Sequence, residues 1–426
     1  MSLREYIDKL RGSGKEYVFL GKLGREYEVT RHAYQVRNRI VEFELEDTGI
    51  HCITNLISNR KDLYTILGVN NDVKAYEKII DAIANPVKLE KVDFNEYFEE
   101  TSYTLEDMPF IKYFREDGGY YLTGSIIVAC IDNICNASFH RIMYVNENEA
   151  VVRIVPRHLY QIHISYSERG EDTPVAIVLG ADPIVELASA ITTRYGLFEL
   201  EIAARLSGDN RVALTPKYKI PVPVTTSIVL EGVISRDKLV EEGPFVDILG
   251  LADIKRKQPV FQLEKIHVNK KYPILYHAIV PSLWDHIFLM GFPREAMIYN
   301  VVKTVSPNVK SVRLTIGSGG WLHAIVSIRQ VKPGEARSVG MAVVTAHPSV
   351  KHVIVVDDDI DVDDPHMVEW AIATRVRGGE DIIIIRNTHG STLDPRSRGG
   401  VGDKVIIDAT KPFDEPWEKY KRVKIP

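Results

Sequence analysis

The chain is poor in cysteine and glutamine, and it has neither a long apolar run nor an excess of positive charge. No apolar run reaches the roughly 18 residues that a bilayer-spanning helix needs, and the N-terminus lacks a signal-peptide pattern. The net charge of −5 argues against broad nucleic-acid binding, which requires a concentrated basic surface. These absences predict a cytoplasmic protein with no membrane span and no nucleic-acid partner.

The 426 residues include three cysteines, Cys52, Cys130 and Cys135, whose spacing fits no zinc ribbon. Cys130 and Cys135 lie in or beside the apolar run 126–134, so we expect buried, inert thiols and no disulfide framework. The chain has only five glutamines, whereas Ile, Val, Glu and Lys are plentiful. This composition resembles that of thermophilic proteins, which avoid thermolabile residues.

A length of 426 residues, 45% hydrophobic, allows several domains with cores of their own, and we predict a mixed α+β and α/β multidomain fold. Residues 1–115 are expected to form a small N-terminal α/β unit that ends in an irregular linker, residues 96–117. Apolar periodicity predicts helices at Leu3–Leu10, capped by Ser2, and at Val73–Ala84.

Residues 116–295 are rich in short apolar or alternating runs, a pattern that predicts a closed or split β-barrel. One helix interrupts these runs, with Asp182 as its cap and Pro183 at its first position. An apolar helical pattern around Phe198–Ala204 places the carboxylate of Glu199 where a charge is costly unless it is paired.

Residues 296–426 alternate between strand and helix patterns and are expected to form a C-terminal α/β domain that serves oligomerisation. The pattern predicts a buried parallel strand at Val353–Val356, a helix at Pro365–Arg375 and another buried strand at Ile382–Ile385. Gly317–Gly320 lacks the Lys-Ser/Thr of a P-loop, which favours a tight turn before the next strand.

The most informative stretch runs from Glu242 through Gly243-Pro244 to Asp247. Proline fixes its own φ and glycine tolerates conformations that other residues avoid, so the turn can aim both carboxylates. Two neighbouring acids let an enzyme separate two pKa values and keep an acid catalyst at neutral pH. An ordinary surface turn is the alternative explanation of the same residues.

Two further groups of residues offer chemistry. Asp357–Asp359 follow a buried strand and could hold Mg²⁺ or Mn²⁺ in a nucleotide-sugar transferase, or simply form an acidic loop before the next helix. Asn136, His158 and Glu199 offer the mixed nitrogen and oxygen donors that suit Mn²⁺. Sequence spacing alone cannot join these three into one site, and each also suits a structural role.

These segments, in their order, resemble the UbiD family of reversible, non-oxidative decarboxylases, which use prenylated FMN. The resemblance covers roughly residues 120–412. It rests on the following segments in order: Asn136-Ala137-Ser138-Phe139-His140-Arg141, Pro156-Arg157-His158, Leu179-Gly180-Ala181-Asp182-Pro183, Glu199, Ile228-Val229-Leu230-Glu231-Gly232, Glu242-Gly243-Pro244-Phe245-Val246-Asp247, the acidic strand end Asp357–Asp359, and Asp408-Ala409-Thr410.

The resemblance implies roles for these residues. Arg141 would hold the substrate carboxylate, Glu242 would orient Arg141, and Asp247 would be the acid. Asn136, His158 and Glu199 would bind Mn²⁺, with K⁺ as a candidate second cation. The implied cofactor-binding residues are Ser138, Phe139, His140, Arg141, Arg153, Arg157, His158 and Lys351. The apolar neighbours of Asp247 independently predict a raised pKa for its carboxyl group.

The resemblance also implies the reaction: 1,3-dipolar cycloaddition of the cofactor to an α,β-unsaturated acid, loss of CO₂ and protonation of the adduct. The substrate implied by the archaeal subgroup, the anhydromevalonate phosphate decarboxylases, is trans-anhydromevalonate 5-phosphate, which yields isopentenyl phosphate. A prenylated 4-hydroxybenzoate or another aromatic acid is an alternative substrate, and a non-catalytic flavin carrier is an alternative of another class. A UbiX-type prenyl-FMN synthase would supply the cofactor to a homodimer or higher homo-oligomer, whose flavin-binding domain would be a split barrel like that of flavin reductases.

Overall fold

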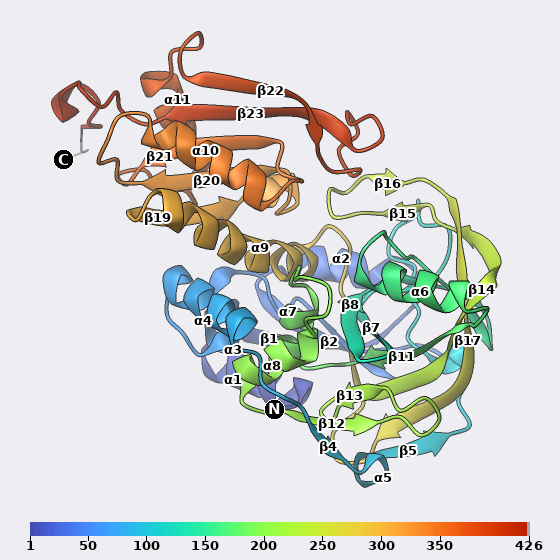
Figure 1. Cartoon of the computed structure of the whole chain (residues 1–426). Helices are drawn as coiled ribbons and strands as arrows, with labels where there is room; N and C mark the ends of the chain where they lie inside the picture. Colours follow the sequence, from blue (N-terminus) through green and yellow to red (C-terminus); the bar gives the residue numbers. More distant parts are fainter. Residues whose placement is uncertain (424–426) are drawn as a thin grey trace. The chain divides into compact units, whose positions relative to one another are not determined.

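The computed structural model describes residues 1–423, which are organised as two compact units (Figure 1). The first unit comprises Met1–Asn70 and Asp81–Leu289, and the second comprises Asn71–Ile80 and the chain from Met290 onward. The division falls inside α4 (Asp72–Ala84) and α9 (Trp284–Val305). The three-domain division 1–115, 116–295 and 296–426 stays a prediction, and each unit is described by itself.

The first unit opens with a four-stranded sheet of order β1-β2-β3-β18, in which the late strand β18 pairs in parallel with β3. Its strands are β1 (Glu16–Leu23), β2 (Arg39–Leu45), β3 (His51–Thr54) and β18 (Leu275–His277). Helix α1 (Leu3–Gly12) begins at a capping box, in which Ser2 Oγ accepts the Glu5 amide and the Glu5 carboxylate accepts the Ser2 amide. Its predicted apolar face is buried, and α4 begins one residue before its predicted start.

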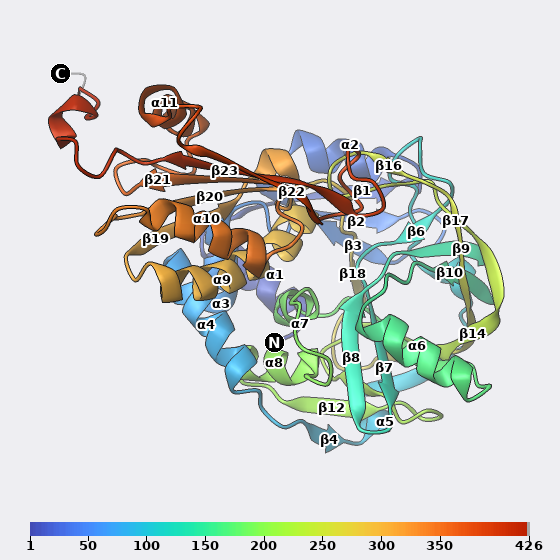
Figure 2. The ribbon, with the colours of Figure 1, turned by 45° about the horizontal axis from the view of Figure 1, so that its top comes forward.

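A nine-stranded sheet forms the centre of the first unit, in the order β6-β9-β10-β17-β14-β11-β7-β8, with β5 paired to β17. Its strands are β5 (Phe98–Thr101), β6 (Tyr121–Leu122), β7 (Ser125–Ile131), β8 (Ile134–Phe139), β9 (Ile142–Asn146), β10 (Glu149–Val152), β11 (Thr173–Leu179), β14 (Ile228–Glu242) and β17 (Arg256–Asn269). Helix α6 (His158–Glu168) packs beside β7 and β8 (Figure 2). These strands cover the predicted β-rich runs.

Smaller elements complete the first unit. They are α2 (Glu28–Gln35), α3 (Arg60–Leu67), β4 (Glu90–Val92), α5 (Phe94–Tyr97), α7 (Pro183–Ser189), α8 (Glu199–Ser207), β12 (Arg211–Leu214), β13 (Pro221–Pro223), β15 (Phe245–Val246) and β16 (Ala252–Asp253). The Asp182 carboxylate caps α7 by accepting two backbone amides, as the sequence predicted. Residues 96–117, expected to be a linker, contribute Leu105, Met108, Phe110 and others to the main hydrophobic core.

The cysteine prediction is wrong for two of the three residues. Cys130 and Cys135 form a disulfide, with a Cα–Cα distance of 4.1 Å, while Cys52 is a free, buried thiol. The β7–β8 hairpin places Cys130 directly opposite Cys135. The apolar run could not reveal this pairing, because it depends on the register between the two strands.

The second unit contains a five-stranded sheet of order β19-β20-β21-β23-β22, with helices on both faces. Its elements are β19 (Val309–Leu314), β20 (His323–Ile328), α10 (Glu335–Ala346), β21 (His352–Asp357), α11 (Pro365–Arg375), β22 (Ile382–His389) and β23 (Val401–Ala409). Helix α10 approaches β23 so closely that a Cβ on Gly340 would lie 2.2 Å from Ile406 Cγ2. Ile407, the next residue of β23, packs instead with the core cluster that contains Val368 and Ala371 of α11.

The predictions for β21, α11 and the Gly317–Gly320 turn are confirmed. Residues Ile382–Ile385 do form a strand, but the prediction that this strand is buried is wrong. Strand β22 is antiparallel to β23 at the sheet edge, with Ile382 38% and Ile384 56% exposed. The helices that were not predicted are α2, α3, α5, α6, α9 and α10. Within residues 1–423, no helix has the length and apolarity that a membrane crossing requires.

Candidate active site

The turn after Glu242 is held by a close approach of two backbone segments. Strand β14 ends at Glu242, Gly243 has a φ of +95°, and β15 begins at Phe245. The Gly118 amide donates a 2.7 Å hydrogen bond to Pro244 O, and a Cβ on Gly118 would lie 2.1 Å from Gly243 O. Only glycine therefore fits at position 118, and the segment before β6 fixes the turn that separates the two carboxylates.

Arg141 and Glu242 form a two-pronged ion pair. Arg141 Nε and Nη2 donate to the two carboxylate oxygens of Glu242 at 2.7 and 2.9 Å, and the Glu242 side chain is completely buried. Nη2 also donates to Asp253 at 3.1 Å, and the guanidinium lies over the Phe245 ring, 4.4 Å from its centre. These partners fix the orientation of Arg141, which can still present donors to an incoming carboxylate.

Asp247 is itself a buried acid and lies in the same region as Arg141 and Glu242. It is 7% exposed, and its Oδ1 accepts a 2.8 Å hydrogen bond from the Leu249 amide. Burial raises the pKa of the Asp247 carboxyl group, and the nearby Asp253 carboxylate raises it further. The raised pKa expected from the apolar neighbours is thereby confirmed. A carboxyl group with a raised pKa holds its proton closer to neutral pH and can serve as an acid.

The three predicted metal ligands converge from three different elements. Glu199, the first residue of α8, is 1% exposed and accepts hydrogen bonds from Asn136 Nδ2 at 3.1 Å and from the Ala137 amide at 2.8 Å. His158, the first residue of α6, places Nδ1 3.7 Å from Glu199 Oε1. Ser138 donates to Asn136 Oδ1 at 2.8 Å. Sequence spacing could not show this convergence.

Within residues 1–423, no group of three or more His, Cys, Asp or Glu side chains could hold a metal ion. The predicted site has only two side chains of these types, His158 and Glu199, because its third residue, Asn136, offers an amide. Their roles as ligands therefore stay a prediction, although their geometry is compact.

The other predicted cofactor-binding residues lie in different places. His140 Nδ1 lies 2.9 Å from Arg153 O and its Nε2 lies 2.9 Å from Ser138 Oγ, and burial lowers the pKa of His140 to about 4. Phe139 pairs with Ile126 across the β7–β8 ladder, and Arg157 is the N-cap of α6. Lys351 lies in the second unit, where its Nζ is 3.0 Å from Asp394.

Three residues near Arg141 were missed by the sequence analysis: Asp253, Arg256 and His286. Asp253 lies between two guanidiniums, since it also accepts from Arg256 Nη2 at 2.7 Å. Burial and the charge of Arg141 lower the pKa of His286 to about 4, so its ring is neutral near pH 7. The one available signal was the basic run that follows Asp253, Lys255-Arg256-Lys257.

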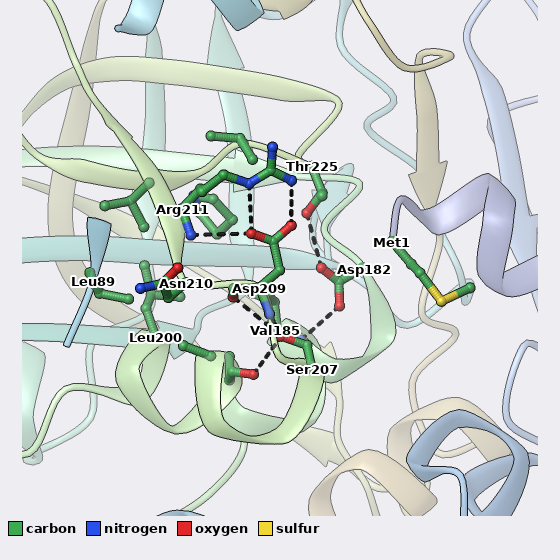
Figure 3. A pocket seen from close by; sticks show the side chains of 15 residues that line it. Met1, Leu89, Asp182, Val185, Leu200, Ser207, Asp209, Asn210, Arg211 and Thr225 are labelled. Carbon is green, nitrogen blue, oxygen red and sulfur yellow. Dashed lines mark hydrogen bonds and ion pairs between the residues drawn. The ribbon is translucent and has the colours of Figure 1, made fainter. Parts of the chain in front are cut away.

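A pocket elsewhere in the first unit does not contain the predicted catalytic residues (Figure 3). Its polar lining includes Asp182, Asp209 and Arg211. The charges there are already satisfied, because Asp209 pairs with Arg211 at 2.7 Å and Asp182 caps α7 and accepts from Thr225 at 3.0 Å. We therefore assign the pocket no chemistry.

The acidic run Asp357–Asp359 has a structural partner. Arg375, completely buried in α11, donates to Asp357 at 2.8 Å and to Asp359 at 2.6 Å, and the Lys411 amide also donates to Asp357. Burial raises the pKa of Asp357 to about 6. These contacts favour the structural interpretation of the run over the nucleotide-sugar interpretation.

Comparisons with known proteins match both parts of the chain. Residues 86–283 match the Rift-related domain of 3-octaprenyl-4-hydroxybenzoate carboxy-lyase, UbiD, and residues 287–409 match its C-terminal domain. An anhydromevalonate phosphate decarboxylase from Aeropyrum pernix is 41% identical over 95% of this chain and 92% of its own. One from Methanothermobacter thermautotrophicus is 38% identical over 91% of each chain.

Among solved structures, the UbiD-class enzyme HmfF from Pelotomaculum thermopropionicum, in complex with FMN, is similar with a TM-score of 0.95 at 32% identity, covering 100% of this chain and 98% of its own. An evolved dimeric form of HmfF in complex with prFMN has a TM-score of 0.90 at 30% identity, with 100% and 97% covered. The mixed α/β multidomain fold is therefore that of UbiD-class enzymes. With both domains matched in sequence and the whole chain matched in structure, this chain belongs to the UbiD family of carboxy-lyases.

Proposed function

We propose that this decarboxylase acts on trans-anhydromevalonate 5-phosphate and releases isopentenyl phosphate and CO₂. The observation that carries the proposal is the buried Arg141–Glu242 pair beside the protonatable Asp247, which supplies a carboxylate holder and an acid at one turn. The anhydromevalonate phosphate decarboxylases, 35–41% identical to this chain, support the choice of substrate.

We propose prenylated FMN as the cofactor, held by the central sheet of the first unit as a split barrel. When bound, it would supply a ring that reacts reversibly with the double bond of the acid. The residues present fit such a group: Asn136, His158 and Glu199 offer mixed donors for an Mn²⁺ ion that can neutralise a phosphate. Ser138 and Arg157 lie beside these donors, in β8 and at the N-terminus of α6.

The residues of the chain would divide the work. Arg141 binds the substrate carboxylate through its Nη1 N–H groups, because Glu242 and Asp253 already accept from Nε and Nη2, and Glu242 keeps the guanidinium in the required orientation. Asp247 holds a proton at its carboxyl group and delivers it to the carbon that loses CO₂. Asp253 stabilises the charge of Arg141 from a second direction.

The experiment uses protein produced together with a UbiX-type prenyl-FMN synthase. We expect the purified protein to form isopentenyl phosphate and CO₂ from trans-anhydromevalonate 5-phosphate, detected by mass spectrometry. Turnover of aromatic acids but not of this substrate would favour the aromatic alternative, since phenolic acid decarboxylases are also related, one of them 33% identical over 72% of this chain. Bound cofactor without turnover of either acid would favour the flavin-carrier alternative.

We also propose that the protein is a homo-oligomer. The edge strand β22 of the second unit exposes Ile382 and Ile384, and an unpaired apolar edge favours association. Light scattering measures the mass directly, and a monomer at micromolar concentration would contradict the proposal.

A further inference from the structure

Three arginines lie near the Glu242 turn: Arg141, Arg153 and Arg256. Only two carboxylates, those of Glu242 and Asp253, form ion pairs with them. Arg141 pairs with Glu242 and Asp253, and Arg256 pairs with Asp253. The Arg153 guanidinium donates only to neutral oxygens, Ile154 O at 2.9 Å and Gln258 Oε1 at 3.4 Å. Within residues 1–423, Arg153 has no carboxylate at ion-pair distance. The cluster therefore carries a positive charge without a counterion.

The backbone holds Arg153 beside the other two arginines. Its amide donates to Arg141 O at 3.1 Å, and Gln258, two residues beyond Arg256 on β17, accepts a 2.9 Å hydrogen bond from the Ile154 amide. Burial, and then the charges of Arg256 and Arg141, lower the pKa of Arg153. Like charges held together destabilise the fold unless an anion joins them, so this arrangement suits an anionic ligand.

We propose that Arg153 and Arg256 form a subsite for a phosphate monoester, which binds the phosphate of the substrate while Arg141 binds its carboxylate. This inference rests on the proposed function. A guanidinium fork matches phosphate oxygens as well as carboxylate oxygens, and a short substrate with an anionic group at each end requires two neighbouring cationic sites.

The resemblance to the family implies that both Arg153 and Arg157 bind the cofactor, whereas the contacts of the two arginines favour only Arg157 for the cofactor phosphate. Arg157 occupies the N-cap position of α6, next to His158, whose Nδ1 lies 3.7 Å from Glu199, and no ion pair engages Arg157 within the described chain. Arg153 instead contacts the segment of Arg141 and Gln258. The two unpaired arginines therefore serve different phosphates, and the experiment separates them.

The experiment compares the full-length holoenzyme with its Arg153→Met, Arg153→Lys and Arg157→Met variants. For each protein, kcat/KM is measured for trans-anhydromevalonate 5-phosphate and for the same acid without its phosphate, and cofactor content is measured by absorbance. Calorimetry measures the binding of isopentenyl phosphate and of inorganic phosphate.

In the Arg153→Met variant, we expect the ratio of the two kcat/KM values to fall about tenfold to a hundredfold, the usual effect of one charge-assisted hydrogen bond. Binding of isopentenyl phosphate should weaken by a similar factor at unchanged cofactor content, and Arg153→Lys should recover part of the ratio. Arg157→Met should reduce cofactor content and keep the ratio.

An unchanged ratio in Arg153→Met would overturn the inference, and so would loss of cofactor with the ratio retained, which would assign Arg153 to the cofactor phosphate. Failure of the wild-type protein to use the phosphorylated acid would refute the proposed function instead. In that case, equal binding of inorganic phosphate by the wild-type and Arg153→Met proteins would refute the subsite, and weaker binding by the variant would support it.

Discussion

The side chains of the candidate site are held in fixed orientations by their hydrogen-bond partners. Glu242 is fully buried, and its two carboxylate oxygens accept hydrogen bonds from Nε and Nη2 of Arg141. The guanidinium therefore cannot turn away from the site. Glu199 is buried as well, and Asn136 and the Ala137 amide hold its two oxygens. A buried carboxylate with fixed hydrogen bonds is pre-organised for binding, because it pays little further cost of ordering.

The first residue-scale prediction concerns Glu199. Glu199→Gln keeps the shape of the side chain but removes its charge, so the protein should lose most of its bound Mn²⁺ and retain less cofactor. Metal analysis of purified protein measures the first effect, and flavin absorbance measures the second. Glu201→Gln, two residues further along α8, is the matched control. Wild-type Mn²⁺ and cofactor content in the Glu199→Gln protein would contradict the assignment.

Elements of the first unit are joined by a buried charged trio. His277 of β18 places Nδ1 2.8 Å from Glu186 of α7 and Nε2 3.3 Å from Asp285 in the first turn of α9. Asp285 also accepts the Asn55 and Ile57 amides, both at 2.6 Å. Burial alone would lower the pKa of His277, but the two carboxylates raise it from 6.5 to about 10. The ring is therefore charged in the folded protein at neutral pH.

This trio gives a prediction for stability and its pH dependence. His277→Gln leaves two buried carboxylates without a cation, so the free energy of unfolding at pH 7 should fall by about 3 to 5 kcal/mol. Because the folded-state pKa is raised, protonation stabilises the wild type fully below pH 6.5, and this contribution is lost as the pH rises toward 10.

Urea unfolding between pH 6 and pH 9.5 measures both effects. The difference between wild type and His277→Gln should narrow as the pH rises, by at most about 1.4 kcal/mol per unit. Adding Glu186→Gln to the variant should restore part of the loss. A difference that stays constant over this range, or grows with pH, would show that His277 is neutral in the folded protein.

At the scale of the whole molecule, the sequence predicted what local patterns and ordered motifs encode. Capped helices such as α1 and α7 followed from the apolar pattern and from their cap residues, Ser2 and Asp182. The residues of the candidate site were found through the resemblance to the family. The order of the motifs can be read from the sequence, whereas the distances between their side chains cannot. The Cys130–Cys135 pair and the edge position of β22 were missed, because strand register and strand order are long-range properties.

Asp253 and Arg256 were missed for a related reason. They reach Arg141 only because β16 pairs back onto β15 and β17 starts opposite Glu242, and neither pairing has a local sequence signature. The residues that surround a motif in space therefore require the structure, even when the motif itself is recognised.

The measurement that tests the central claim most directly is decarboxylation in deuterated water by the wild-type and Asp247→Asn holoenzymes. We expect the wild type to place deuterium at the carbon that loses CO₂. Asp247→Asn should retain the cofactor but lose about 10² to 10⁴-fold in turnover and in exchange of deuterium into the product, because the amide cannot deliver a proton. Exchange at the wild-type rate in Asp247→Asn would contradict the account and assign the proton to another residue.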